Sequence, residues 1–346
     1  MSGANILFLG LFNDFLIFPK NKCQINGYFN GGKNALARRL KRLVFITLLL
    51  QGMSSWSAPL TELPFKLRSG LIWIQVDGGR GAKPLHFILD SGAEASVIDL
   101  QTARRLHLPL GEAVTIRGIN ATSLGYWTDS LSARLNGIEL SSKYLAMDLS
   151  AVSAACHLKV DGLIGADFFA GRVVQIDFAK EKVRLLEHSP SSATAVTLPL
   201  QIEGSRLRVP VEVVGLGKAW TRLDTGCASD LHWAVSKEAF DGQSSTDELG
   251  VGVSSMLIRQ NNHSVRLGDL TLDNIATGLH TEKLLAGESG LLGAGLLAHF
   301  AIVTIDEPGG HVTLESYSNS KPLQPWLVRL PYPAFAPVTS TQRKPK

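Results

Sequence analysis

Residues 87–98 of this chain read Phe-Ile-Leu-Asp-Ser-Gly-Ala-Glu-Ala-Ser-Val-Ile, and residues 221–233 read Thr-Arg-Leu-Asp-Thr-Gly-Cys-Ala-Ser-Asp-Leu-His-Trp. In both stretches a strand-like segment leads into Asp-Ser-Gly or Asp-Thr-Gly. One such tripeptide says little, because Asp, Ser, Thr and Gly all favour turns. Two copies in similar surroundings indicate that one structural unit is used twice, with Asp90 and Asp224 in matching positions.

The sequence around each tripeptide also repeats in order. A Leu-Pro pair precedes each Asp, and a Gly-rich apolar segment and an Ile-Asp pair follow it. The matching segments are Leu63–Leu67 and Leu198–Ile202, Gly162–Ala166 and Gly290–Ala294, and Ile176-Asp177 and Ile305-Asp306. This order predicts an internal duplication with a repeat of about 130 residues.

The paired motifs resemble those of the pepsin and retropepsin family of aspartic peptidases, in which each lobe carries Asp-Ser/Thr-Gly and, later, an apolar-apolar-Gly element. The resemblance extends over about residues 63–318. It implies a mainly β, bilobal pepsin-like acid protease fold with an internal pseudo-twofold duplication. The parts that we expect are an N-terminal extension with a signal-like segment (1–57), an N-terminal catalytic lobe (58–187), a linker (188–197), a C-terminal catalytic lobe (198–325) and a Pro-rich basic tail (326–346).

The chemistry implied by this resemblance needs two carboxyl groups in contact. Held about 3 Å apart they cannot both ionise cheaply, so Asp90 and Asp224 are expected to share one proton. The ionised member acts as general base on a water molecule, and the protonated member acts as general acid. The sequence leaves open which aspartate takes which role.

Four neighbouring residues are expected to support the two aspartates. Gly92 and Gly226 let the two loops approach without a Cβ and offer backbone N–H groups to the carboxylates. Ser91 and Thr225 can form hydrogen bonds to the opposite loop and so brace the pair. No metal and no cofactor is expected, because no Cys stands at metal-ligand spacing from a His.

The resemblance also implies a hairpin that closes over the substrate, at about residues 115–127. Its predicted substrate-binding residues are Gly118, Ile119, Tyr126 and Trp127, although the two aromatic residues could equally be ordinary strand residues. The expected partner is a peptide or protein substrate. Since one chain supplies both motifs, we expect a monomer.

One position departs from the pepsin pattern, which has Ser directly after each motif. This chain has Ala93 and Cys227 there, and neither side chain is a good hydrogen-bond donor to a carboxylate. The charged form of the pair is then less favoured, which predicts activity at mildly acidic or neutral pH. Cys227 and Cys156 are expected to remain unpaired, with a disulfide between them as the alternative.

The formal net charge of +4 comes from the termini, since residues 1–42 alone hold seven Lys and Arg and one Asp. No basic face for nucleic acid is therefore expected. Arg38, Arg39, Lys41 and Arg42 precede the apolar run Leu43–Leu50, and small residues stand before Ala58. This pattern predicts a cleaved signal and export to the periplasm or the cell exterior, with membrane association through an uncleaved anchor as the alternative.

Two other functions remain open at this point. One is a peptide-binding module of the same fold that does not cleave, in which Asp90 and Asp224 only cap turns. The other is a membrane-tethered processing factor that uses the N-terminal segment as its anchor. Four further aspartates without a counterpart in the other half are expected at the surface or in turns, namely Asp99, Asp129, Asp161 and Asp230.

Overall fold

The computed structural model describes residues that lie between positions 59 and 318. The described residues are 59–77, 83–118, 121–128, 131, 134–135, 138–141, 143–236, 246–249, 255–281 and 287–318. The predicted signal-like segment and the predicted basic tail lie outside them. No helix within these ranges has the length and apolar character that a membrane span requires.

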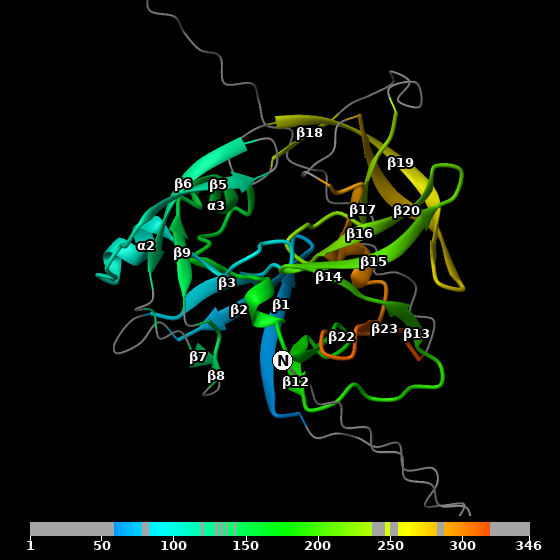
Figure 1. Ribbon diagram of the computed structural model, residues 1–346, viewed down its shortest axis with the longest axis horizontal. Coiled ribbons are helices and arrows are strands. Elements are labelled where there is room, and N and C mark those ends of the chain that lie inside the picture. Colours follow the sequence, from blue (N-terminus) through cyan, green and yellow to red (C-terminus); the bar gives the residue numbers. More distant parts are fainter. Residues whose placement is uncertain are drawn as a thin grey trace, which may run out of the picture. The chain divides into compact units, whose positions relative to one another are not determined.

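The described part of the chain is mainly β, as predicted, and its helices are short (Figure 1). Before residue 190 the strands are β1 (Thr61–Arg68), β2 (Leu71–Val76), β3 (Leu85–Leu89), β4 (Val97–Asp99), β5 (Ala113–Gly118), β6 (Ala121–Thr128), β7 (Arg134–Leu135), β8 (Ile138–Glu139), β9 (Tyr144–Met147), β10 (Gly162–Ile164), β11 (Val173–Asp177) and β12 (Lys182–Leu186). After it they are β13 (Val196–Pro199), β14 (Gln201–Glu203), β15 (Arg206–Val213), β16 (Gly217–Asp224), β17 (Leu231–Ala234), β18 (Thr246–Leu249), β19 (Ser255–Leu267), β20 (Leu270–His280), β21 (Gly290–Gly293), β22 (Ile302–Asp306) and β23 (His311–Glu315). The helical segments are α2 (Leu100–Arg105), α3 (Ser150–Ala155), η1 (Ala166–Phe168) and α4 (Ala294–Leu297).

The two halves of the chain use the same order of strand pairings. The strands β2, β3, β10, β4 and β9 are neighbours in the first half, and β15, β16, β21, β17 and β20 are neighbours in the second. In each set the successive pairings are antiparallel, parallel, antiparallel and parallel. The carboxyl ends of β3 and β16, where the two motifs begin, therefore occupy corresponding places in their sheets.

A strand pair from the two Ile-Asp segments joins the halves. Strand β11 pairs antiparallel with β22, and Gln175 at the centre of one lies opposite Thr304 at the centre of the other. Gln175 Nε2 donates a hydrogen bond to Thr304 Oγ1 at 3.2 Å. The corresponding strands of the two halves thus meet at their midpoints, and they continue the larger sheet from one half into the other.

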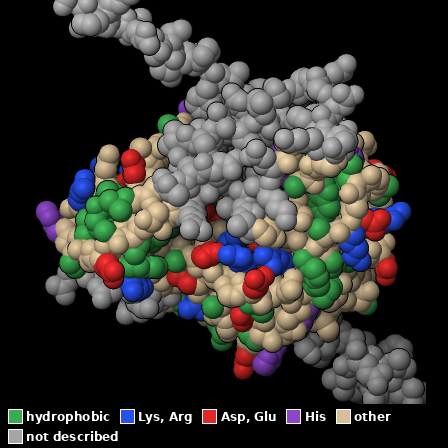
Figure 2. All heavy atoms as spheres, turned by 45° about the horizontal axis from the view of Figure 1, so that its top comes forward, with side chains coloured by type: hydrophobic (Ala, Val, Ile, Leu, Met, Phe, Trp, Pro, Cys, Tyr) green, Lys and Arg blue, Asp and Glu red, His purple; other side chains and the backbone are tan. Residues whose placement is uncertain are grey.

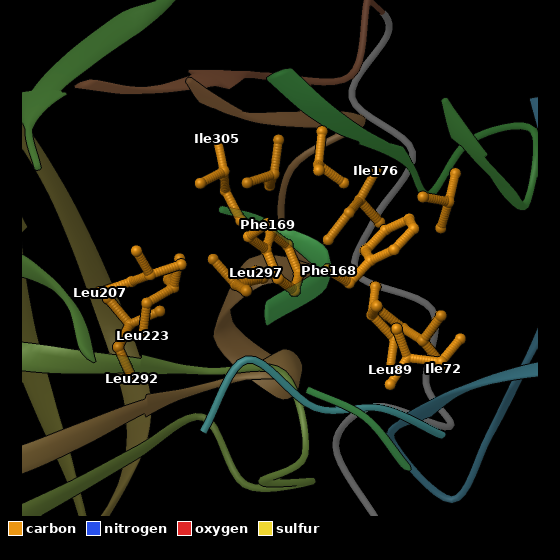
Figure 3. Packing of buried hydrophobic residues seen from close by; sticks show 14 of the residues in the cluster. Ile72, Leu89, Phe168, Phe169, Ile176, Leu207, Leu223, Leu292, Leu297 and Ile305 are labelled. Carbon is orange, nitrogen blue, oxygen red and sulfur yellow. The ribbon is translucent and has the colours of Figure 1, made fainter. Parts of the chain in front are cut away.

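Apolar side chains from both halves form one buried core (Figure 3). Ile176 and Ile305 come from the central strand pair, and the rings of Phe168 and Phe169 meet edge to face at 5.7 Å. Burying one such side chain contributes about 1.5–3 kcal/mol. Because this core extends across the junction, it holds the halves in the register that the central strands define.

The exposed charges include several pairs of opposite sign. Lys66 contacts Glu181 at 2.8 Å, and Arg266 contacts Glu212 at 2.7 Å. On the face shown in Figure 2, acidic and basic side chains accordingly lie next to one another rather than in separate patches. Pairs of this exposed kind contribute about 0–1 kcal/mol each, so they do not decide the fold.

Two aspartates that were expected at the surface or in turns, Asp99 and Asp161, are buried, so for them the surface part of this expectation was wrong. Asp99 caps α2 by accepting a hydrogen bond from the Thr102 N–H at 3.0 Å, and it also pairs with Lys159. Asp161 accepts hydrogen bonds from Thr102 Oγ1 at 2.8 Å and from the His86 N–H at 3.0 Å. Buried carboxylates persist where partners of this kind replace water.

We expect Ile176→Ala to destabilise the protein by about 2–5 kcal/mol, because it removes a fully buried side chain of the central strand pair and leaves a cavity. The measurement is chemical denaturation followed by circular dichroism. Lys66→Ala, at a largely exposed position of β1, is the matched control and should change stability by less than about 0.5 kcal/mol. Equal effects of the two substitutions would contradict the central role of this core.

Candidate active site

The structure brings the two motifs together at the ends of corresponding strands. Asp90 directly follows β3, and Asp224 is the last residue of β16. Each strand end is held by a parallel neighbour: the Asp90 N–H donates to Ile164 O at 2.8 Å, and Asp224 pairs with Gly293. The two loops therefore start from rigid positions within their sheets.

Reciprocal hydrogen bonds connect the two loops. The Ser91 N–H donates to Thr225 Oγ1 at 2.9 Å, and the Thr225 N–H donates to Ser91 Oγ at 3.1 Å. Each hydroxyl in turn donates to the carbonyl of the residue before the opposite aspartate, Ser91 to Leu223 and Thr225 to Leu89, both at 2.8 Å. Both side chains are fully buried, so these four bonds fix one loop on the other without competition from water.

The motif glycines lie against the opposite aspartates. A Cβ on Gly92 would overlap the carboxyl group of Asp224, and a Cβ on Gly226 would overlap that of Asp90. Their backbone N–H groups donate instead to the aspartate of their own loop, both at 3.0 Å, and the Ala93 N–H adds a bond to Asp90 at 3.1 Å. Glycine at both positions allows the close approach of the carboxyl groups.

The two carboxyl groups interact electrostatically. Both aspartates are half-buried. Desolvation and the negative charge of Asp224 raise the pKa of Asp90 to about 8. Desolvation also raises the pKa of Asp224, but the positive charge of Arg222 and the hydrogen bond from the Gly226 N–H oppose this rise. The pair thus holds one proton more readily than two separate aspartates would.

The predicted substrate-binding hairpin is formed by β5 and β6. Gly118 ends β5, and Ile119 lies outside the described residues. Tyr126 and Trp127 are half-buried in β6, where the Nζ atom of Lys143 lies 4.5 Å from the centre of the Trp127 ring. The pairings of β6 with β5 and β9 place both residues in the sheet, and their part in substrate binding stays a prediction.

A buried charged cluster next to the second motif was not predicted from the sequence. Arg222 donates from Nη2 to Gly92 O at 2.6 Å, and its Nη1 lies 3.9 Å from Glu288. Arg208 binds both carboxylate oxygens of Glu288. One feature of the sequence could have indicated this cluster. Arg222 stands two residues before Asp224, where the first motif has an apolar residue, Ile88, before Asp90.

The described residues contain no group of three or more His, Cys, Asp or Glu that could hold a metal ion. Cys156 and Cys227 are not joined to each other, as predicted. Burial raises the pKa of the Cys156 thiol, which makes it less reactive.

A comparison with protein families supports the interpretation of the first half. The family described as aspartyl protease matches residues 74–168, a range that contains the first motif and not the second. No curated protein matches the chain. The first half of the chain is therefore similar to aspartyl proteases.

We expect Ser91→Ala to destabilise the protein by about 1–3 kcal/mol, because it leaves the buried Thr225 N–H and the Leu223 carbonyl without their partner. The free energy of unfolding in urea measures this effect. Ser192→Ala is the control, since that hydroxyl is exposed and contacts only another hydroxyl, that of Thr194. A Ser91→Ala protein as stable as this control would show that the bonds between the loops contribute little.

The raised pKa of Asp90 makes the stability of the protein depend on pH. Between the ordinary value of 3.8 and about 8, Asp90 keeps its proton in the folded protein and loses it on unfolding. The folded state then binds more protons, so stability falls as pH rises, by at most about 1.4 kcal/mol per pH unit.

Asp90→Asn should flatten this slope of unfolding free energy against pH between pH 4 and 8, because the substituted side chain does not titrate. Urea denaturation at several pH values measures the slope. Asp269→Asn, at an exposed position, should leave it unchanged. A slope that stays the same in Asp90→Asn would mean that Asp90 is ionised in the folded protein at these pH values.

Proposed function

We propose that this protein is an aspartic endopeptidase that hydrolyses peptide bonds of peptides or proteins with Asp90 and Asp224. The observation that carries the proposal is that each half-buried carboxyl group lies directly against the glycine of the opposite motif, in loops that are bound to each other. The match of the first half to aspartyl proteases supports the same reaction.

The proposed reaction uses the single proton of the pair. The ionised carboxylate takes a proton from a water molecule, whose oxygen bonds to the carbonyl carbon of the peptide. The protonated carboxyl group gives its proton to the carbonyl oxygen, so the pair again holds one proton when the tetrahedral intermediate has formed. The pair then gives its proton to the peptide nitrogen and takes one from a hydroxyl of the tetrahedral intermediate, so that the carbon–nitrogen bond breaks to give a carboxylic acid and an amine. Ser91, Gly92, Thr225 and Gly226 support this chemistry by fixing the distance between the carboxyl groups.

We further infer that the halves are two repeats of a pepsin-like fold and that one chain forms a complete site. The shared order of strand pairings and the joining of Gln175 to Thr304 at the centre of the sheet support this inference. A monomer is then sufficient for activity. Export to the periplasm or cell exterior belongs to the same proposal and is supported by the basic and apolar pattern that ends at Ala58.

Asp90→Asn and Asp224→Asn should each reduce kcat by at least about 1,000-fold, and the double variant should lose little more, because the two groups act as a unit. The assay is cleavage of a fluorogenic peptide library by the purified full chain, with products identified by mass spectrometry. Asp269→Asn should retain full activity, since this side chain is exposed. Peptide binding without cleavage by the unmutated protein would instead identify a binding module, and more than a tenth of the rate in Asp224→Asn would remove Asp224 from the mechanism.

A further inference from the structure

One cluster of side chains differs completely between the two halves, although the strands that carry it pair in the same way. Trp73 lies opposite Ile88 between β2 and β3, and Arg208 lies opposite Arg222 between β15 and β16. The corresponding positions in the first half belong to a buried apolar cluster and are Trp73, Ile88, Val97, Met147 and Val160. In the second half they are Arg208, Arg222, His232, His280 and Glu288, and all five are buried.

The buried charged side chains of this second-half cluster carry more positive than negative charge. Glu288 is fully buried and bound by Arg208 at 2.9–3.3 Å, whereas Arg222 lies farther from it, at 3.9 Å. Glu203 also pairs with Arg208, but its side chain is 61% exposed, so water screens its charge. Among Arg208, Arg222 and Glu288 one positive charge is therefore in excess, and Arg222 is the cation with the weaker carboxylate contact.

Arg222 lies where its positive charge can act on the aspartate pair. It stands two residues before Asp224 on β16, so the two side chains leave the strand on the same face. Its side chain is only 4% exposed, which limits screening by water. Its hydrogen bond to Gly92 O, at 2.6 Å, reaches across to the opposite loop and fixes the guanidinium beside the pair. The corresponding residue before Asp90, Ile88, carries no charge.

We propose that Arg222 is a positioning residue that decides which aspartate is charged, so that Asp224 carries the negative charge and Asp90 carries the shared proton. This proposal rests on the proposed function. Asp224 is then the general base that takes the proton from water, and Asp90 is the general acid that protonates the carbonyl oxygen. The positive charge of Arg222 and the negative charge of the pair neutralise each other in the resting enzyme.

The described charged and titratable side chains around the pair agree with this assignment. They are Arg222 on β16, His232 on β17, Arg208 on β15, Glu288 before β21, Glu94 and Cys227 in the motif loops. After desolvation, which raises the pKa of Asp224, the largest influence is Arg222, which lowers it, and His232 lowers it further. For Asp90 desolvation and the charge of Asp224 both raise the pKa.

The first test is the pH profile of kcat/KM in Arg222→Gln and Arg222→Ile. The glutamine keeps an N–H donor for Gly92 O and removes the charge. The isoleucine is the residue at the corresponding position of the first half, Ile88. In both variants the acidic limb should move to higher pH by about one unit or more, because the ionised pair loses its cation. Arg222→Lys keeps a charge and should retain a limb close to that of the unmutated protein.

Arg184→Gln is the matched control. Only 12% of the Arg184 side chain is exposed, and it pairs with two carboxylates, Glu62 and Asp177, but it belongs to the central sheet. It should lower the free energy of unfolding without moving the acidic limb. A limb that stays in place in a folded Arg222→Gln protein, or that moves equally in Arg184→Gln, would overturn the proposal.

A second test does not depend on catalysis. The carboxyl ¹³C signals of Asp90 and Asp224, assigned with the two Asn variants, are followed by NMR as pH rises. Asp224 should ionise first, and Arg222→Gln should bring the two ionisation steps to closer pH values. Ionisation of Asp90 first would overturn the assignment. A protein that titrates as expected but cleaves no peptide would refute the proposed function and leave the role of Arg222 intact.

Discussion

The contact between the Ser91 and Thr225 loops is the interaction on which the rest of the site depends. Two carboxyl groups repel when both are ionised, so they stay close only if other bonds hold their loops together. The reciprocal bonds do this with buried hydroxyl groups, each of which accepts from one backbone N–H and donates to one carbonyl. Each hydroxyl is thereby satisfied as donor and as acceptor, so neither needs a hydrogen bond to the carboxyl groups.

Two features act in opposite directions on the charge of the aspartate pair. The absence of a hydroxyl at Ala93 removes a hydrogen bond that would stabilise a carboxylate, and Cys227 offers only a weak donor in the other loop. Arg222 supplies a buried positive charge that stabilises the same carboxylate form. The residues of the motif loops reveal the missing hydroxyl groups but not the added positive charge, because Arg222 precedes the motif.

The features that were predicted from the sequence are those that repeat along the chain, and the features that were missed occur in one half only. The mainly β class followed from the strand-like segments, and the two motifs followed from their common surroundings. The buried charges were missed because burial depends on pairing between distant strands. Arg222 looks like a surface arginine until β21 places Glu288 beside it, and Asp161 looks like a turn residue until Thr102 and His86 donate to it.

The apolar cluster of the first half and the charged cluster of the second make the surroundings of the two aspartates unequal. A site built from two identical chains gives both aspartates the same surroundings, so only the arriving substrate can make them different. In a single chain each half can vary independently, and here a cation stands behind Asp224 while an isoleucine stands behind Asp90. We propose that the acid and the base are thereby distinguished within the protein before any substrate binds.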